Sequence, residues 1–160
     1  MVNLGIIIVI GAVLGSMGIA MYMYTQYQTN FVTGIAGEPI TVGPVEYIIT
    51  FEGTFEGTKE AKPENTFVKI GIVAKNISNE ETNLSGGQFF FIDGNKKTEA
   101  TYGEFDANDL LFEKIEPNKP VQRTTQFDVD FDEEKQYKIL IRPQKEQSTV
   151  DTASVCIINC

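Results

Sequence analysis

Residues 66–75 carry the sequence TFVKIGIVAK, and this stretch decides the fold that we expect for the chain. Its apolar side chains fall on every second position, at Val68, Ile70, Ile72 and Ala74. Lys69 and Lys75 lie on the opposite face, so the pattern has the period of two that is typical of a β-strand with one buried side. We therefore expect a strand here, near the centre of a sheet.

Other segments on both sides of this strand show similar patterns. They are residues 45–51, 88–92, 96–102, 121–131 and 137–141. The sequence Asp93-Gly94-Asn95 separates the second from the third and is a strong signal for a hairpin turn. Only residues 107–114 indicate a short helical turn.

Two of these segments allow predictions about individual faces. The polar row of residues 121–131 consists of Gln122, Thr124, Gln126, Asp128 and Asp130. Because Phe127, Val129 and Phe131 occupy the opposite face, we expect the polar row to face water. Three consecutive phenylalanines in residues 88–92 cannot all point inward, and we expect Phe90 to be exposed or to cover a sheet edge.

Six or seven short strands with turns between them fit an all-β, immunoglobulin-like β-sandwich, with a small barrel as the alternative. The chain has two cysteines and no tryptophan, so it lacks the Cys, Trp, Cys core of antibody domains, and the likeness is architectural. The expected organisation is an anchor over residues 1–30, a stalk over 31–37, the sandwich over 38–143 and a tail over 144–160.

The N-terminal segment predicts a single transmembrane helix. Residues 4–24 read LGIIIVIGAVLGSMGIAMYMY, and the first charged residue of the chain is Glu38. At 1.5 Å per residue this segment is about 30 Å long as a helix, which matches the hydrocarbon thickness of a bilayer. The alternative is a signal peptide cleaved near Gly18-Ile19-Ala20. Because no Lys or Arg precedes the apolar run, and because the run continues beyond Ala20, we favour an uncleaved anchor in contact with membrane lipid.

Two further features concern this helix and its orientation. Gly11 and Gly15 form a GxxxG motif, with Gly18 near the same face, and this motif predicts close packing against a second helix. The acidic remainder of the chain favours a cytoplasmic N-terminus and an extracytoplasmic C-terminal domain in a single-pass protein of the cell membrane.

Charge and composition exclude several functional classes. The chain has 22 acidic and 13 basic residues, a net charge of −9, so we expect no nucleic-acid partner. It has no histidine, which removes the commonest general base and most catalytic zinc or copper sites. We therefore expect neither an enzyme nor a cofactor.

Some residue clusters remain candidate sites. Asp128, Asp130 and Asp132 could supply oxygen ligands to Ca²⁺, but they lack the spacing of an EF-hand, so a solvated edge is favoured. Asp106 and its neighbours at positions 108 and 109 form a second, weaker oxygen-rich group. Cys156 and Cys160 could form a disulfide outside the cytoplasm or remain two free thiols.

Two triplets fit the N-glycosylation rule. They begin at Asn76 and Asn83, in a segment that we expect to be a loop after the central strand. A structural alternative applies to Asn76, because asparagine is also a favoured turn residue.

Several short stretches together resemble the telokin-like DUF4352 family of secreted or membrane-anchored domains. They are GEPITV at 37–42, VEYII at 45–49, TFVKI at 66–70, AKNIS at 74–78, FFFIDG at 89–94, IEPNK at 115–119 and FDV at 127–129. Asn118 stands where that family often has glycine, and asparagine also tolerates a positive φ. The resemblance covers about residues 37–142. It implies an exported immunoglobulin-like sandwich on an anchor and supplies no catalytic residue.

The layout is also similar in architecture to archaeal surface-filament components, although no Lys or Arg marks a processing site before Gly5. Three functions follow from this layout. The first is a binding or display module that contacts another surface protein through sheet edges and loops. The second is an accessory subunit of a membrane complex, and the third is a filament subunit, a homo-oligomer in which residues 150–158 add a strand to a neighbour. Residues 150–158 could instead add a last strand to their own sheet.

Overall fold

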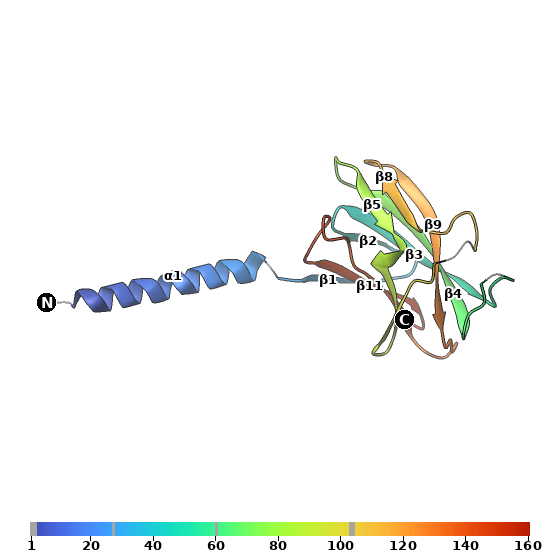
Figure 1. The fold of residues 1–160 in the computed structure, drawn as a ribbon, viewed down its shortest axis with the longest axis horizontal. Helices are drawn as coiled ribbons and strands as arrows, with labels where there is room; N and C mark the ends of the chain where they lie inside the picture. The colour runs from blue at the N-terminus through green and yellow to red at the C-terminus, as the bar shows by residue number, and fades with distance from the viewer. Residues whose placement is uncertain (1–2, 27, 60, 103–104) are drawn as a thin grey trace. The chain divides into compact units, whose positions relative to one another are not determined.

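The computed structural model describes residues 3–26, 28–59, 61–102 and 105–160 and divides the chain into two units, Met1–Asn30 and Phe31–Cys160. The first unit is dominated by the helix α1 (Leu4–Gln26), shown in blue in Figure 1. Its segment Gly5–Thr25 is long and apolar enough to cross a membrane, and none of it is buried within the structure. The expected apolar helix is therefore present.

The second unit is an immunoglobulin-like β-sandwich of two main sheets. One sheet has the order β1 (Asn30–Ile35), β11 (Asp151–Ile158), β10 (Tyr137–Ile141), β6 (Phe89–Asp93) and β7 (Lys96–Glu99). The other has the order β2 (Pro39–Val42), β3 (Val45–Phe55), β4 (Thr66–Asn76) and β9 (Pro120–Val129). A small third sheet pairs β5 (Thr82–Ser85) with β8 (Phe112–Ile115), and a 3-10 turn, η1 (Gly86–Gln88), links β5 to β6.

The core lies between the two main sheets, and β4 is central to it, as predicted. The apolar row of β4 is fully buried at Val68, Ile70, Ile72 and Ala74. β4 pairs with β3 on one side and with β9 on the other. From β6, Phe89 packs edge-on against Tyr47 of β3, with the ring centroids 5.8 Å apart. The alternating strands supply much of this core, and short strands add Ile40, Val42, Leu84 and Ile115.

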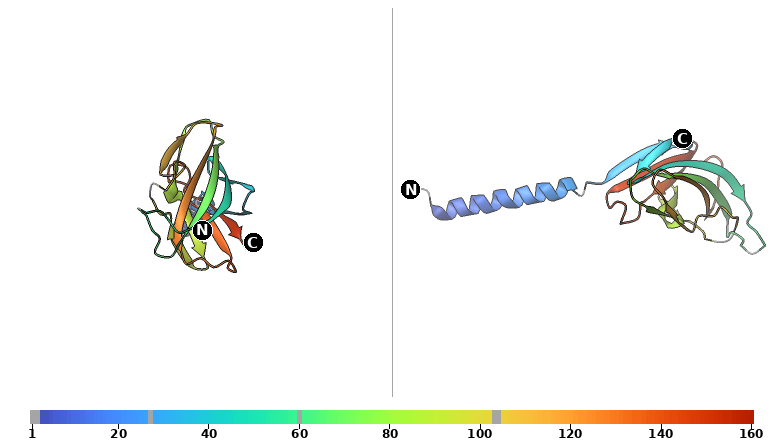
Figure 2. Two further views of the ribbon diagram at one scale, coloured as in Figure 1. Left: turned by 90° about the vertical axis from the view of Figure 1, so that its right-hand side faces the viewer. Right: turned by 90° about the horizontal axis from the view of Figure 1, so that it is seen from above.

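The expected stalk and tail are wrong as separate segments, because both belong to the sandwich. β1 lies at the edge of the five-stranded sheet beside β11, which is an inner strand. The amide of Ala36, directly after β1, donates to the carbonyl of Cys156 at 2.8 Å. In Figure 2 the light-blue β1 and the red β11 lie alongside each other and run in the same direction. The sandwich therefore begins almost immediately after α1.

The connection from β7 to β8 also differs from expectation. Residues 107–114 form a turn followed by β8, not a helical turn. This connection crosses the free edge of β9, where Leu110 N donates to Thr124 O at 2.8 Å and Gln126 Nε2 donates to Thr101 O at 2.8 Å. Thr124 and Gln126 are consequently buried, and the expectation of a wet polar row on β9 is wrong at these positions.

Two turns follow the predicted chemistry. β6 and β7 pair as the expected hairpin, and Gly94 in its turn has a φ of +54°. Asn118, in the turn before β9, has a φ of +61°. Asparagine therefore adopts here the left-handed conformation for which glycine is the usual choice.

Candidate functional site

The side chain of Asn76 closes a turn and is not available for modification. It is fully buried, and its Nδ2 donates to the carbonyls of Ile115 at 3.0 Å and Glu80 at 2.6 Å. Its Oδ1 accepts from the backbone N and the hydroxyl of Ser78 at 3.0 and 2.8 Å. The prediction of a glycosylation site at Asn76 is wrong, because a glycan cannot be attached to a buried amide whose atoms are all bonded within the fold.

Asn83 differs from Asn76 in its surroundings. It lies in β5, opposite Lys114 of β8, and is half-buried, so the expectation that it stands in a loop is wrong. Its modification stays a prediction.

The three aspartates considered for Ca²⁺ serve separate local structures. Asp128 accepts from the backbone amides of Glu64 and Asn65 at 2.6 and 2.9 Å, and Asp132 accepts from that of Glu134 at 2.9 Å. The carbonyl of Asp130 faces the Tyr137 hydroxyl. Among the residues that the structure describes, no three metal-ligating side chains come together. The proposed calcium cluster is therefore not assembled.

The second oxygen-rich group stabilises the β7–β8 connection. Asp106 forms an ion pair with Lys69, and this hydrogen bond is the main reason why the pKa of Asp106 lies below its ordinary value. Asp109 accepts from the amides of Phe105 and Asp106 at 2.7 and 3.1 Å. These carboxylates hold a loop in place, and their bonds explain their positions without a ligand.

Cys156 and Cys160 are joined by a disulfide at the end of β11. Between them, Asn159 has a φ of +53°, and its Nδ2 donates to the carbonyls of Glu133 and Lys135 at 2.7 and 2.8 Å. The disulfide and this amide together fasten the end of β11 to the connection between β9 and β10. In α1, a Cβ built at Gly11, Gly15 or Gly18 would meet no atom within 4 Å, so this face of the helix is uncovered in the single chain.

A pocket on the outer face of the five-stranded sheet has a different character, and we call it the outer-sheet pocket. It has a volume of about 550 Å³ and is open to solvent. Its walls come from η1, β6, the end of β10, the β10–β11 loop and the start of β11. Its lining includes Gln88, Phe90, Arg142, Pro143, Ser148 and Thr152.

Charge distinguishes this pocket from the other hollows of the surface. The chain has two arginines, Arg123 and Arg142. Arg123 forms an ion pair with Glu113, at 2.7 Å, in another hollow. Arg142 has no ion pair within the described part of the chain, and Lys145 adds a second positive charge to the same pocket. With the negative charge of Asp151, which also lines it, the outer-sheet pocket carries two positive charges and one negative charge on a protein whose net charge is −9.

A network of amides fixes one side of the pocket. Gln88 Oε1 accepts from Ser85 N at 2.8 Å, and Gln88 Nε2 donates to Gln147 Oε1 at 2.8 Å. Gln147 Nε2 in turn donates to the Thr82 hydroxyl and the Asn83 carbonyl at 2.7 and 2.6 Å. These bonds tie the β10–β11 loop to β5 and η1. The shape of the pocket is thus set before any ligand arrives.

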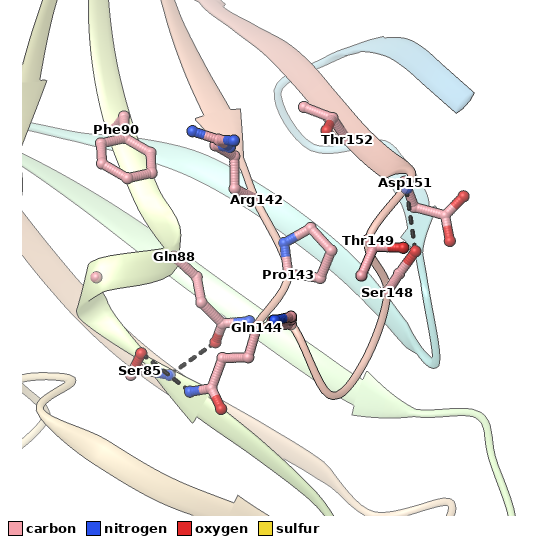
Figure 3. A pocket seen from close by; sticks show the side chains of 12 residues that line it. Ser85, Gln88, Phe90, Arg142, Pro143, Gln144, Ser148, Thr149, Asp151 and Thr152 are labelled. Atoms are coloured by element: carbon pink, nitrogen blue, oxygen red, sulfur yellow. Dashed lines mark hydrogen bonds between the residues drawn. The ribbon is translucent and has the colours of Figure 1, made fainter. Parts of the chain in front are cut away.

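Figure 3 shows the arrangement of the side chains in the outer-sheet pocket. Arg142 extends beside Phe90, and Thr152 lies across from it, whereas the Asp151 carboxylate points away from Arg142. Phe90 is half-buried, as its place on the outer face requires, and Lys97 Nζ lies 4.1 Å from the centroid of its ring. No local sequence pattern indicates this pocket, because its lining residues come from distant segments between positions 85 and 152.

Comparisons with known proteins agree with the fold. A model of a family described as a domain of unknown function, DUF4352, matches residues 35–150. A search of curated proteins finds no match.

The solved structures that resemble the chain include the following three proteins. The yjhA protein of Bacillus subtilis is 13% identical with a TM-score of 0.61, and the match covers 78% of this chain and 98% of yjhA. The secreted protein MPT63 of Mycobacterium tuberculosis is 8% identical with a TM-score of 0.61, over 81% of this chain and 98% of MPT63. The ycdA protein of Bacillus subtilis, a proposed lipoprotein, is 18% identical with a TM-score of 0.59, over 75% of this chain. The chain spans only 38% of the length of ycdA. At identities this low, the likeness to these proteins shows a shared fold and nothing about function.

Proposed function

The chain belongs to the DUF4352 family, and from this premise we propose that it is a non-catalytic binding module held at the outer face of a cell membrane by α1. In this proposal the N-terminus is cytoplasmic, the helix crosses the membrane once and the sandwich is extracytoplasmic. The sandwich binds another surface component without chemical turnover.

The exposed apolar helix carries the proposal. All side chains described in the segment Gly5–Thr25 are exposed, although the segment is almost entirely apolar. An exposed helix that is apolar on all sides is unfavourable in water and favourable in a bilayer. The second unit has the opposite character, since it carries every charged side chain and has its own apolar core.

Two observations support the extracytoplasmic side. The disulfide between Cys156 and Cys160 is of a kind that persists in oxidising compartments and is rare in the cytoplasm. Two proteins of similar fold, MPT63 and ycdA, are described as a secreted protein and a proposed lipoprotein. For this chain, the same compartment is our proposal.

The outer-sheet pocket and the chemistry of the side chains support binding over catalysis. The chain offers no histidine as a general base. The pocket instead offers a fixed wall of amides, an arginine and several hydroxyls, which are groups that hold a ligand. Of the alternative functions, a filament built by strand exchange has no support in the fold, because β11 already occupies the position between β1 and β10.

The anchor is tested by following the full chain in cells. We expect the mature protein to retain residues 1–30 by mass spectrometry, to stay in the membrane fraction after alkaline washing, and to react with a membrane-impermeant lysine reagent. Leu14→Arg places a charge near the middle of α1 at a cost of about 3 kcal/mol, so it should shift protein to the soluble fraction, whereas Leu14→Ile should not. A mature protein that begins after Ala20 contradicts the anchor.

The accessory-subunit alternative has its own test. If α1 packs against a helix of another protein, Gly11→Ile together with Gly15→Ile should remove co-purifying partners, because two larger side chains prevent close approach. If the sandwich is the binding part, the same variant should keep those partners. Cross-linking in intact cells followed by mass spectrometry distinguishes the two results.

A further inference from the structure

We propose that the outer-sheet pocket binds an acidic saccharide whose carboxylate is held by Arg142. This inference rests on the proposed function, because it assigns the class of ligand that the displayed sandwich binds. Three features of the pocket support it: the unpaired guanidinium, the hydroxyl and amide groups around it, and the position of the pocket on inner strands.

Arg142 is suited to an oxyanion. It follows β10 directly, its backbone N donates to the Gln88 carbonyl at 2.8 Å, and its side chain is exposed. The main chain is therefore fixed, while the guanidinium is not engaged by a carboxylate of the described chain. A planar guanidinium with five donors binds a carboxylate by two parallel hydrogen bonds. In a chain with 22 acidic residues, an arginine left without such a partner is notable.

The groups around Arg142 match the rest of a sugar. The lining includes hydroxyl groups of Ser85, Ser148, Thr149 and Thr152 and the amide group of Gln144, whereas the buried Gln88 amide is bonded to Ser85 and Gln147. Hydroxyls and amides both donate and accept hydrogen bonds, as sugar hydroxyls require. Phe90 and Pro143 provide apolar surface for the C–H groups of a sugar ring. A volume of about 550 Å³ lies within the usual range for sites of small ligands.

The position of the pocket argues against a peptide as the ligand. An extended peptide is commonly recognised by adding a strand to a free sheet edge. The strands beneath this pocket, β6, β10 and β11, each have a neighbour on both sides, so their backbone groups are already paired. A ligand here must be recognised by side chains alone, and the side chains present are those that suit a polyhydroxylated anion.

The test uses NMR of the full chain in lipid nanodiscs with ¹⁵N-labelled arginine. Because the chain has two arginines, the Nε–H region contains one reporter in the pocket, Arg142, and one internal control, Arg123 in its ion pair. The probe is a tetramer of galacturonic acid, and the matched ligand is the same tetramer with its carboxyl groups methyl-esterified. We expect the acid tetramer to shift the Arg142 signal in a saturable way and to leave that of Arg123 unchanged, while the ester binds at least about tenfold more weakly.

Variants identify the residue responsible. Arg142→Gln should weaken binding of the acid tetramer, measured by calorimetry, by at least about tenfold, because the charged hydrogen bonds are lost. Arg142→Lys should recover only part of the affinity, since lysine cannot form the two parallel bonds. The matched control is Lys62→Gln together with Lys96→Gln. It removes two exposed charges, one in the connection after β3 and one at the start of β7. Neither lysine lines the pocket, so binding should be unchanged.

Four results would overturn the inference. Three are equal binding of acid and ester, equal binding by wild type and Arg142→Gln, and a preference of the pocket for an oligoglutamate peptide over the saccharide. The fourth is no binding of either tetramer at millimolar concentration. None of these results affects the anchor, which the fractionation and mass experiments test separately.

Discussion

Tyr47 and Tyr137 are both fully buried, but their hydroxyls have different surroundings. The Tyr137 hydroxyl accepts from Asp132 N at 2.8 Å. The Tyr47 hydroxyl has no hydrogen-bond partner among the described residues, and the amide of nearby Gln88 is bonded instead to Ser85 and Gln147. A buried polar group without a partner reduces stability.

This difference predicts opposite effects for the same substitution. Tyr47→Phe should leave the free energy of unfolding unchanged or raise it by up to about 1 kcal/mol, since it removes an unsatisfied group. Tyr137→Phe should lower it by about 1 kcal/mol, because Asp132 N loses its acceptor. Urea denaturation of the two variants measures both values. Equal losses in the two variants would contradict the assignment.

The Tyr47 variant should also change the response to alkaline pH. Burial raises the pKa of the Tyr47 hydroxyl far above its ordinary value of 10.0, while Gln88 acts in the opposite direction. Above pH 10 the unfolded chain loses this proton and the folded chain keeps it, so stability falls as pH rises. The stability advantage of Tyr47→Phe over wild type should therefore grow above that pH in the same denaturation experiment.

Asn76 gives a second prediction at this scale. Asn76→Ala should lower the free energy of unfolding by about 2–4 kcal/mol, because it leaves the buried Ile115 carbonyl and Ser78 amide without partners. Asn79→Ala, in the same turn but exposed, should change it by less than about 0.5 kcal/mol. Thermal unfolding measures the melting temperatures of the two variants. Similar melting temperatures would refute the stabilising role of the Asn76 side chain in this turn.

Among the elements, β1 is the strand that connects the sandwich to α1 in the chain. Val32 of β1 is partly buried and packs against the core, whereas Thr33 is exposed. β1 also pairs with β11, so we expect a change that unfolds β1 to destabilise β11 as well.

A matched pair of substitutions tests whether β1 is a strand of the sandwich. Val32→Asp should lower the free energy of unfolding by at least about 2 kcal/mol, since it moves a carboxylate against the core. Thr33→Asp should have an effect below about 0.5 kcal/mol. In a loose stalk, both changes would be equally harmless, and denaturant titration separates these outcomes.

The strands differ in how far the sequence predicts them. β3, β4, β9 and β10 contain regular alternation, and each was expected near its observed position. β2, β5 and β8 have four residues each, too few for a period to stand out, and β1 was hidden in polar, uncharged sequence. The burial of Thr124 depends on the β7–β8 connection, and the outer-sheet pocket depends on how loops far apart in the chain meet, so neither is encoded in local pattern.

At the scale of the whole molecule, the chain consists of an apolar, exposed helix and a sandwich that carries the charged side chains. Every residue of the core cluster lies in the second unit, Phe31–Cys160, and none comes from α1. The sandwich therefore has what it needs to fold in water without the helix.

Cleavage of the full chain within residues 27–29 tests this independence. We expect a specific protease site placed there to release a soluble sandwich whose urea midpoint equals that of the intact chain in nanodiscs. The reason is that cleavage exposes no core residue. A released fragment with a clearly lower midpoint would show that α1 contributes to the stability of the sandwich.

The side-by-side course of β1 and β11 has a mechanical consequence. Tension between the helix and the opposite end of the sandwich pulls β1 along its own length, so the hydrogen bonds to β11 are loaded together and not one after another. The Cys156–Cys160 disulfide keeps residues 156–160 from straightening under that load. Because forced unfolding depends on the height of the unfolding barrier, we expect rupture in one high-force step in single-molecule pulling, and stepwise peeling at low force would contradict this.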